Sequence, residues 1–262
     1  MSDILETICD ASRADLDAAK KRLPFAELLS AAEKTPRAAS FKNALRARGG
    51  NPAVIAEMKK ASPSAGLIRA DFEPSKLCVE LESAGASALS VLTERNYFLG
   101  SLEFLRDAAT RVKIPLLRKD FIFDEYQIAE AKAAGASAVL LIAKMLKKPD
   151  FKRLFDFAKS LSLDVLAEAH DEAEIEAALD CGADIVGVNC RNLRTFGLDF
   201  SVSERLLKTL PDGVVKVAES GVDSRETLLR ARGAGADAAL VGTALMKAQS
   251  PSEALKKLLG AL

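Results

Sequence analysis

The sequence predicts an α/β protein that folds as a single (β/α)8 TIM barrel with a helical N-terminal extension. The first observation is a Gly-Ala pair that follows an amphipathic stretch and precedes a short β-type run four times, at Gly85, Gly135, Gly182 and Gly235. The second is the distance between these glycines, 50, 47 and 53 residues, which is too long for one strand and helix and fits two of each. A second strand-like run lies within each period, so the chain should contain eight strands.

The eight expected strands are short apolar runs, four with the Gly-Ala pair and four without it. The unmarked runs are PAVIAEMK from Pro52, IPLLRKD from Ile114, LDVLAEAH from Leu163 and VVKVAES from Val214. The marked runs are AGASALSVLT from Ala84, AGASAVLLIA from Ala134, CGADIVGVNC from Cys181 and AGADAALVGT from Ala234. Their alternation with helical segments indicates a parallel sheet, because consecutive parallel strands need a helical crossover.

Amphipathic segments between these runs are expected to form the crossover helices. They are Pro74 to Ala84, Ser101 to Arg111, Asp124 to Ala134, Pro149 to Leu161, Asp171 to Cys181, Ser201 to Leu210, Ser224 to Gly233 and Pro251 to Leu262. Asp171 and Ser224 are the residue types that cap helix N-termini. An open doubly wound sheet would fit the same alternation, but the fourfold repeat favours closure, and no GxGxxG turn follows the first strand.

Residues 1–50 precede the first strand and are not needed by a minimal barrel, which residues 51–262 can form. They are expected to be helical from Ile4 to Arg22 and again after Pro24. The extension either caps the barrel floor or folds over the mouth, and the sequence leaves both arrangements open.

Composition and charge argue against several kinds of partner and site. Lys and Arg together number 37, and so do Asp and Glu, so the net charge is zero. No overall electrostatic field therefore favours nucleic acid or an anionic membrane as a partner. The acidic start MSDILETICD is unlike a signal peptide, and no apolar run is long enough to span a bilayer, so we expect a cytoplasmic protein. The four cysteines have no CxxC spacing and only one histidine beside them, so we expect neither a metal site nor disulfides.

The C-terminal ends of the expected strands carry a cluster of charged residues, at the place where barrel active sites lie. Alternation along a strand puts Glu57 and Lys59 on one face, and the same parity makes Lys119 point inward. Together with Glu168 and Glu219, these side chains should converge on the mouth of the barrel. Burial of so many charges is costly unless they pair or serve a ligand, which favours a functional site.

Tight turns after the last two strands favour phosphate binding. Gly221 and Gly242 with Thr243 lie in ESGVDS and VGTALM, at the usual position of a barrel phosphate site. His170 directly precedes a helix start, which favours a capping or hinge role over catalysis. Proton transfer therefore falls to Lys and Glu side chains.

The run VIAEMKKASPSAGLI closely resembles the signature of the indole-3-glycerol phosphate synthase family. The likeness continues in the expected order through ALSVLTERNYFLGSLEFL, PLLRKDFIFDEYQI, LAEAHDEAEIEAAL, VGVNCRNLRTFGLD and VAESGV. The resemblance implies ring closure of 1-(2-carboxyphenylamino)-1-deoxy-D-ribulose 5-phosphate, loss of carbon dioxide, and dehydration to indole-3-glycerol phosphate in tryptophan biosynthesis. It implies no cofactor.

The resemblance also implies roles for individual residues. Lys119 would be the acid in ring closure, Lys59 with Glu57 would serve the loss of the hydroxyl, and Glu168 is a candidate base. Which lysine acts at which step stays open. The further positions that match the family are Asn189, Glu219 and Ser220 among the catalytic residues, Arg191 beside them for substrate binding, and Ser62, Gly221, Gly242 and Thr243 on the phosphate side.

An apolar slot for the anthranilate ring is expected from Phe98, Phe121, Phe123 and Leu140, at or after strand ends. Cys190 is expected to point away from the site. Two other functions remain open: a barrel like phosphoribosylanthranilate isomerase, whose strand-one cysteine is absent here, and a non-catalytic phosphometabolite-binding barrel. The sequence does not address association with other enzymes of the pathway.

Overall fold

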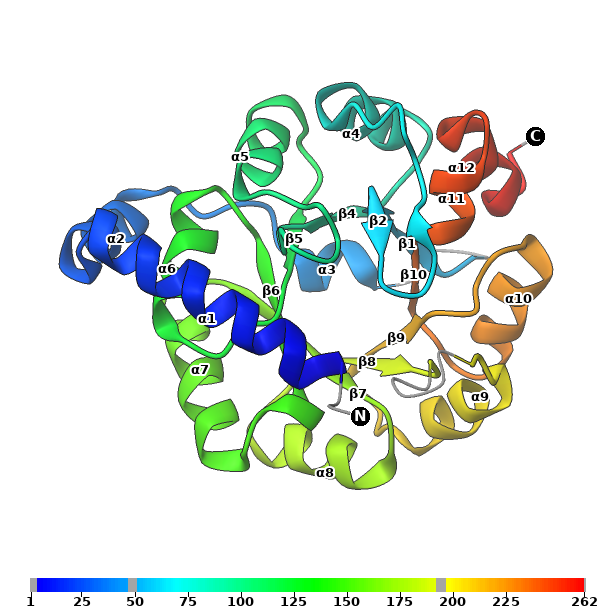
Figure 1. Cartoon of the computed structure of the whole chain (residues 1–262). Coiled ribbons are helices and arrows are strands. Elements are labelled where there is room, and N and C mark those ends of the chain that lie inside the picture. The colour runs from blue at the N-terminus through cyan, green and yellow to red at the C-terminus, as the bar shows by residue number, and fades with distance from the viewer. Residues whose placement is uncertain (1–3, 47–50, 192–196, 262) are drawn as a thin grey trace.

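Eight parallel strands close into a barrel in the computed structural model, which describes residues 4–46, 51–191 and 197–261. The barrel order is β1, β10, β9, β8, β7, β6, β5 and β4, and β4 closes the ring on β1 (Figure 1). The predicted fold is therefore confirmed. The strand bounds are β1 (Ala53–Met58), β4 (Ala88–Leu92), β5 (Leu116–Lys119), β6 (Ala138–Ile142), β7 (Asp164–Ala169), β8 (Ile185–Asn189), β9 (Val215–Glu219) and β10 (Ala238–Val241).

The predicted crossover helices are all present around this ring. Asp171 and Ser224 cap α8 and α10 by accepting hydrogen bonds from backbone N–H groups, as expected. The last helix ends earlier than predicted because Gly260 adopts a left-handed φ of +74°. The bounds are α4 (Pro74–Ser83), α5 (Leu102–Arg111), α6 (Glu125–Ala133), α7 (Lys148–Ser160), α8 (Glu172–Asp180), α9 (Phe200–Thr209), α10 (Arg225–Gly233) and α12 (Pro251–Leu259).

The four Gly-Ala pairs terminate four of these helices in the same way. Their glycines have φ between +87° and +103°, a region that glycine enters without steric cost. After α4, the N–H of Ala86 donates to the carbonyl of Leu81, and the same bond across five residues ends α6, α8 and α10. This is the Schellman arrangement, in which the left-handed residue turns the chain and the next N–H satisfies a terminal carbonyl. The repeat therefore marks helix ends that lead directly into even-numbered barrel strands.

Short elements absent from the sequence prediction lie in the connections. They are the hairpin strands β2 (Ala61–Ser62) and β3 (Gly66–Leu67), the helix α3 (Phe41–Leu45), the 3-10 turn η1 (Ala143–Met145) and the helix α11 (Thr243–Lys247). Elements of two to five residues carry too few residues for a periodic hydrophobic pattern.

Alternate residues along the strands separate two apolar layers. Ile55, Leu117 and Leu166 fill the barrel interior, whereas Met58, Val139 and Val186 pack outward against the helices. The parity of Leu117 puts Lys119 on the inner face, as the sequence predicts.

The extension covers both ends of the barrel, so both arrangements left open by the sequence occur. Helix α1 (Ile4–Arg22) lies over the mouth, where Leu5 and Ile8 line the central cavity (Figure 1). Helix α3 closes the opposite end, because Phe41 and Leu45 belong to the interior apolar layer.

The segment between these two helices runs down the side of the barrel. Helix α2 (Phe25–Lys34) packs against α6, and the Tyr126 hydroxyl donates to the carbonyls of Ala19 and Leu23. At the floor, Lys42 pairs with Asp184 at 2.7 Å.

The described residues contain neither a helix suited to span a membrane nor a cluster of side chains suited to bind a metal ion. None of the helices is long and apolar enough to cross a membrane. Within the same part of the chain, His, Cys, Asp and Glu side chains form no group that could hold a metal ion.

Candidate active site

A cavity of about 400 Å³ opens at the C-terminal ends of the barrel strands. It brings together all the site residues that the sequence predicts. They are Glu57, Lys59, Ser62, Lys119, Glu168, Asn189, Arg191, Glu219, Ser220, Gly221, Gly242 and Thr243.

Glu57 and Lys59 form an ion pair at the end of β1, on one side of the cavity. Lys59 Nζ lies 2.6 Å from Glu57 Oε2, and both side chains are largely buried. Gly242 makes room for this carboxylate, because a Cβ at that position would overlap Glu57 Oε2. The glycine at the end of β10 therefore determines the position of a charged group on the neighbouring strand.

Lys119, at the end of β5, lies beside two further carboxylates of the cavity. Its Nζ is 2.9 Å from Glu168 Oε2 and 3.7 Å from Glu219 Oε2. The amide nitrogen of Asn189 donates to the other oxygen of Glu168 at 3.0 Å. Strands β5, β7, β8 and β9 thus each supply one member of this cluster.

The two carboxylates beside Lys119 have opposite pKa shifts. Burial opposes ionisation of Glu168, but the nearby Lys119 and His170, with hydrogen bonds from Lys119 and Asn189, lower its pKa from 4.5 to about 2. Burial and the negative charge of Glu168 raise the pKa of Glu219 well above its usual value. The surroundings therefore favour the ionised form of Glu168 and the protonated form of Glu219.

Lys119 keeps its proton in this state. Burial favours the neutral amine, but Glu168, Glu219 and Glu57 together outweigh burial and raise the pKa of Lys119 above its usual value. The cavity is thus lined by a buried lysine that its carboxylate neighbours keep in the ammonium form.

Glu219 occupies space that a glycine leaves free on β8. A Cβ at Gly187 would overlap Glu219 Oε1. Within the described part of the chain, this oxygen is buried without a hydrogen-bond partner. A buried polar atom of this kind normally has a partner, so a ligand group is the natural complement.

The turn after β9 has unusual backbone geometry. Ser220 and Gly221 have φ of +65° and +74°, and the first is uncommon for a residue with a side chain. After the neighbouring strand β10, α11 begins directly after Gly242, and its residues Thr243 and Ala244 line the wall. Backbone strain at such a position is typical of functional sites.

The apolar wall contains three of the four residues expected for the anthranilate slot. Phe98, Phe121 and Leu140 line the cavity, with the two phenylalanine rings 6.0 Å apart. Phe123 lies outside it, because the loop after β5 turns this ring toward α1, where the Arg13 guanidinium lies 4.8 Å from the ring centroid.

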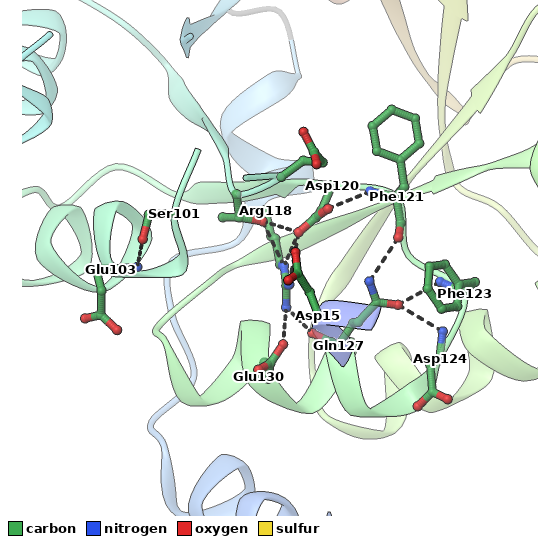
Figure 2. Close-up of polar contacts among 12 residues, drawn as sticks. Asp15, Ser101, Glu103, Arg118, Asp120, Phe121, Phe123, Asp124, Gln127 and Glu130 are labelled. Atoms are coloured by element: carbon green, nitrogen blue, oxygen red, sulfur yellow. Dashed lines mark hydrogen bonds and ion pairs between the residues drawn. The ribbon is translucent and has the colours of Figure 1, made fainter. Parts of the chain in front are cut away.

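A buried polar network holds the end of β5 from behind (Figure 2). Arg118 and Asp120, on either side of Lys119, form an ion pair at 3.0 Å on the outer face of the strand. Arg118 also donates to the carbonyl of Gln127, and the Gln127 amide donates to the carbonyl of Phe121. The network therefore supports both Lys119 and the aromatic residue that follows it.

Sequence reasoning missed the part of the wall that α1 supplies. Ile4, Leu5 and Ile8 line the cavity, and Lys247 of α11 adds a cation near the predicted phosphate turn. The spacing of the three apolar residues defines one face of α1, but it does not indicate what that face contacts.

His170 and Cys190 lie beside the cavity, and neither lines it. The backbone N–H of His170 donates to Glu174 Oε2 at 2.8 Å, but the residue that caps α8 is Asp171. The Cys190 thiol is buried near the carbonyls of Glu219 and Ser220, and burial raises its pKa. Its position agrees with the expectation that it points away from the site.

Comparison with known proteins adds independent information. A family model described as indole-3-glycerol phosphate synthase matches residues 5–258. A protein named indole-3-glycerol phosphate synthase from Koribacter versatilis is 51% identical, over 99% of this chain and 100% of that protein. Proteins of the same name from Campylobacter fetus and Chromobacterium violaceum are each 44% identical over 98% of this chain, and cover 99% and 98% of their own lengths.

Solved structures with low sequence identity share the fold. A thiamine phosphate pyrophosphorylase from Pyrococcus furiosus is 15% identical with a TM-score of 0.61, and the match covers 84% of this chain and 96% of that protein. A tryptophan synthase alpha-subunit from the same organism has the same identity and TM-score, over 79% of this chain and 98% of that subunit. At this identity the likeness concerns the barrel architecture alone.

Proposed function

Since this chain belongs to the indole-3-glycerol phosphate synthase family and is a carboxy-lyase of tryptophan biosynthesis, we propose that the charged groups at the barrel mouth carry out both halves of its reaction. The substrate is 1-(2-carboxyphenylamino)-1-deoxy-D-ribulose 5-phosphate. Ring closure releases carbon dioxide, and dehydration then gives indole-3-glycerol phosphate.

We propose that the substrate spans the cavity from its apolar wall to the turns after β9 and β10. The anthranilate ring lies against Phe98, Phe121 and Leu140, beneath the apolar face of α1. The phosphate lies at the opposite side, near Gly221 and Thr243. This arrangement puts the reacting carbons between the two lysines.

The phosphate side consists of the residues that the sequence assigns to it. Backbone N–H groups at Gly221, Gly242 and Thr243, with the hydroxyl of Ser62, are suited to an anion because each is a neutral donor at a turn. Asn189 and Arg191 lie between the two ends of the substrate and are proposed to hold its hydroxyls and carboxylate.

Lys119 is the proposed acid in ring closure. The carbonyl oxygen of the substrate gains negative charge as the aromatic carbon attacks, and a buried ammonium stabilises this charge and donates its proton. The observation that supports this role most directly is the position of Lys119 Nζ, inside the cavity and 2.9 Å from Glu168.

Dehydration requires an acid for the departing hydroxyl and a base for the proton that is lost. We assign the acid to Lys59, whose charge is held by Glu57 at 2.6 Å. Glu168 is the proposed base, because it is the ionised member of the buried carboxyl pair. The surroundings of Glu219 favour its protonated form, and in that form it is proposed to donate a hydrogen bond to the substrate or to Glu168, with Ser220 beside it at the strand end.

Other properties of the protein are proposed on composition alone. We propose a cytoplasmic location, a phosphorylated small molecule as ligand, and no role for nucleic acid or a membrane surface. We also propose that residues 1–50 act as an extension of a single structural domain formed by residues 51–262.

The reaction is tested by incubating the purified protein with the carboxyphenylamino-ribulose phosphate and following indole fluorescence. Lys119→Met should abolish product formation. Lys132→Met is a matched control, because Lys132 is also a buried lysine but its Nζ donates to the carbonyl of Pro36, away from the mouth.

Each outcome has a definite meaning. Absence of product with the unaltered protein would contradict the proposed function and favour a barrel that only binds phosphorylated metabolites. Product formation by Lys119→Met at the unaltered rate would contradict the acid role of Lys119.

A further inference from the structure

The ring of His170 lies between two carboxylates, one of which is the proposed base. Nδ1 is 3.1 Å from Glu174 Oε2, and Nε2 is 3.5 Å from Glu168 Oε1. The side chain is 10% exposed, and Nε2 has no hydrogen-bond partner within the described part of the chain. The established activity gives this histidine no role.

The hydrogen-bonding capacity of these groups restricts the charge state of the ring. An ionised carboxylate only accepts hydrogen bonds, so each ring nitrogen that faces one is complementary only when it carries a proton. A neutral imidazole carries one N–H, and its other nitrogen would turn a lone pair toward a carboxylate oxygen. The imidazolium satisfies both sides, and two nearby anions favour it electrostatically.

We propose that His170, held by Glu174, is a positioning residue whose imidazolium is the second counter-cation of Glu168 and keeps that carboxylate ionised for the dehydration half of the reaction. This inference rests on the proposed function, in which Lys119 acts as the acid and Glu168 as the base.

The need for a second cation follows from the proton balance. In ring closure a Lys119 N–H bond breaks and an O–H bond forms on the substrate, so Lys119 becomes a neutral amine. Glu168 then loses the positive charge that lies 2.9 Å from its Oε2. Asn189 still donates to Oε1, but it is neutral. His170 is the remaining cation at the carboxylate when the next proton must be accepted.

Among the described residues of the elements packed around His170, other charged side chains are exposed or paired elsewhere. Lys144 is exposed on η1, which packs on both β7 and α8. On α7, Lys148 pairs with Asp180 and Lys159 with Asp164. The Asp171 side chain caps α8. The contribution of His170 to the lowered pKa of Glu168 is in the direction that the inference requires.

The first experiment uses the fact that the chain has one histidine. Untagged protein with isotopically labelled histidine gives a single set of ring-nitrogen NMR signals, which need no assignment. At neutral pH we expect both ring nitrogens to be protonated in the unaltered protein. Glu174→Gln should shift the signals toward the neutral ring, whereas Glu172→Gln, on the exposed side of the same helix, should leave them unchanged. A neutral ring in the unaltered protein would overturn the inference.

The second experiment measures the two halves of the reaction separately by rapid quench. His170→Gln and Glu174→Gln should lower kcat by about 10-fold, because the proposed base then lacks the cation that remains beside it after Lys119 has given up its proton. KM should stay unchanged, and a decarboxylated intermediate that still carries its hydroxyl should accumulate. His170→Lys, which restores a positive charge, should recover part of the rate.

A purely structural role predicts a different pattern. It predicts loss of thermal stability in both neutral variants without accumulation of the intermediate, and that result would refute the inference. Absence of any product with the unaltered protein would instead refute the proposed function, so the two failures are distinguishable.

Discussion

The opposite pKa shifts of Glu168 and Glu219 predict different effects for two chemically identical substitutions. Glutamine resembles a protonated carboxyl group in shape and cannot ionise. Glu219→Gln should therefore retain the neutral form that the surroundings of Glu219 favour, whereas Glu168→Gln removes the ionised state on which the proposed base depends.

The magnitudes follow from the environment of each group. The lowering of the Glu168 pKa from 4.5 to about 2 corresponds to about 3 kcal/mol in favour of its ionised form. Glu168→Gln removes this charge and leaves buried Lys119 without its nearest carboxylate, so we expect a loss of stability of about 3 kcal/mol. Loss of a general base should lower kcat by about 100-fold or more. Glu219→Gln should stay within about 10-fold of the unaltered kcat.

Steady-state indole fluorescence at neutral pH gives kcat and KM for both variants, and urea unfolding gives their stabilities. The reasoning is refuted if Glu219→Gln is as inactive as Glu168→Gln, or if Glu168→Gln keeps the unaltered rate. Raising the pH provides a second check. The raised pKa of Glu219 means that its contribution to stability is fully present below the ordinary carboxyl pKa and is lost as pH rises through the folded pKa, so Glu219→Gln should gain stability relative to the unaltered protein over that rise.

Other substitutions test the remaining parts of the site. Gly242→Ala should lower kcat by at least about 10-fold, because the new Cβ displaces the carboxylate at the end of β1; Gly233→Ala, where space is open, is the control. Ile8→Ala should raise KM by about 10-fold with kcat nearly unchanged, in the same fluorescence assay, because the apolar wall loses contact with the substrate ring. Asp120→Ala should lower the free energy of unfolding in urea by about 3 kcal/mol, because it leaves the buried arginine of β5 without its nearest carboxylate. Finally, acid should destabilise the protein between about pH 4.5 and 2 as Glu168 takes up protons, and urea unfolding across that range should show a smaller slope in Glu168→Gln.

Local patterns were sufficient to predict the barrel and the inward-facing charges. The Gly-Ala pairs succeed because a left-handed glycine followed by a small buried residue is a local requirement of the helix end. The positions of Glu57 and Lys59 follow from alternation along a strand, which depends on two residues in one segment.

Features that depend on contacts between distant segments could not be predicted in the same way. The aromatic ring of Phe123 follows a strand end like that of Phe121, but the loop turns it toward Arg13 of α1. The separation of the Glu168 and Glu219 pKa values depends on distances between side chains of three strands. Their sequences alone make these two glutamates equivalent.

The N-terminal segment from α1 to α3 can take its place only after later parts of the chain have been made. Tyr126 binds backbone groups 103 and 107 residues earlier, and Lys42 pairs with a residue 142 positions later. During synthesis these segments therefore stay exposed to solvent until α6 and β8 have been made. Closing such long loops is slow, and the apolar faces of α1 and α2 stay exposed to chaperones or to other chains in that interval. The segment that completes the catalytic cavity is thus also the one most vulnerable to misassembly before the barrel closes.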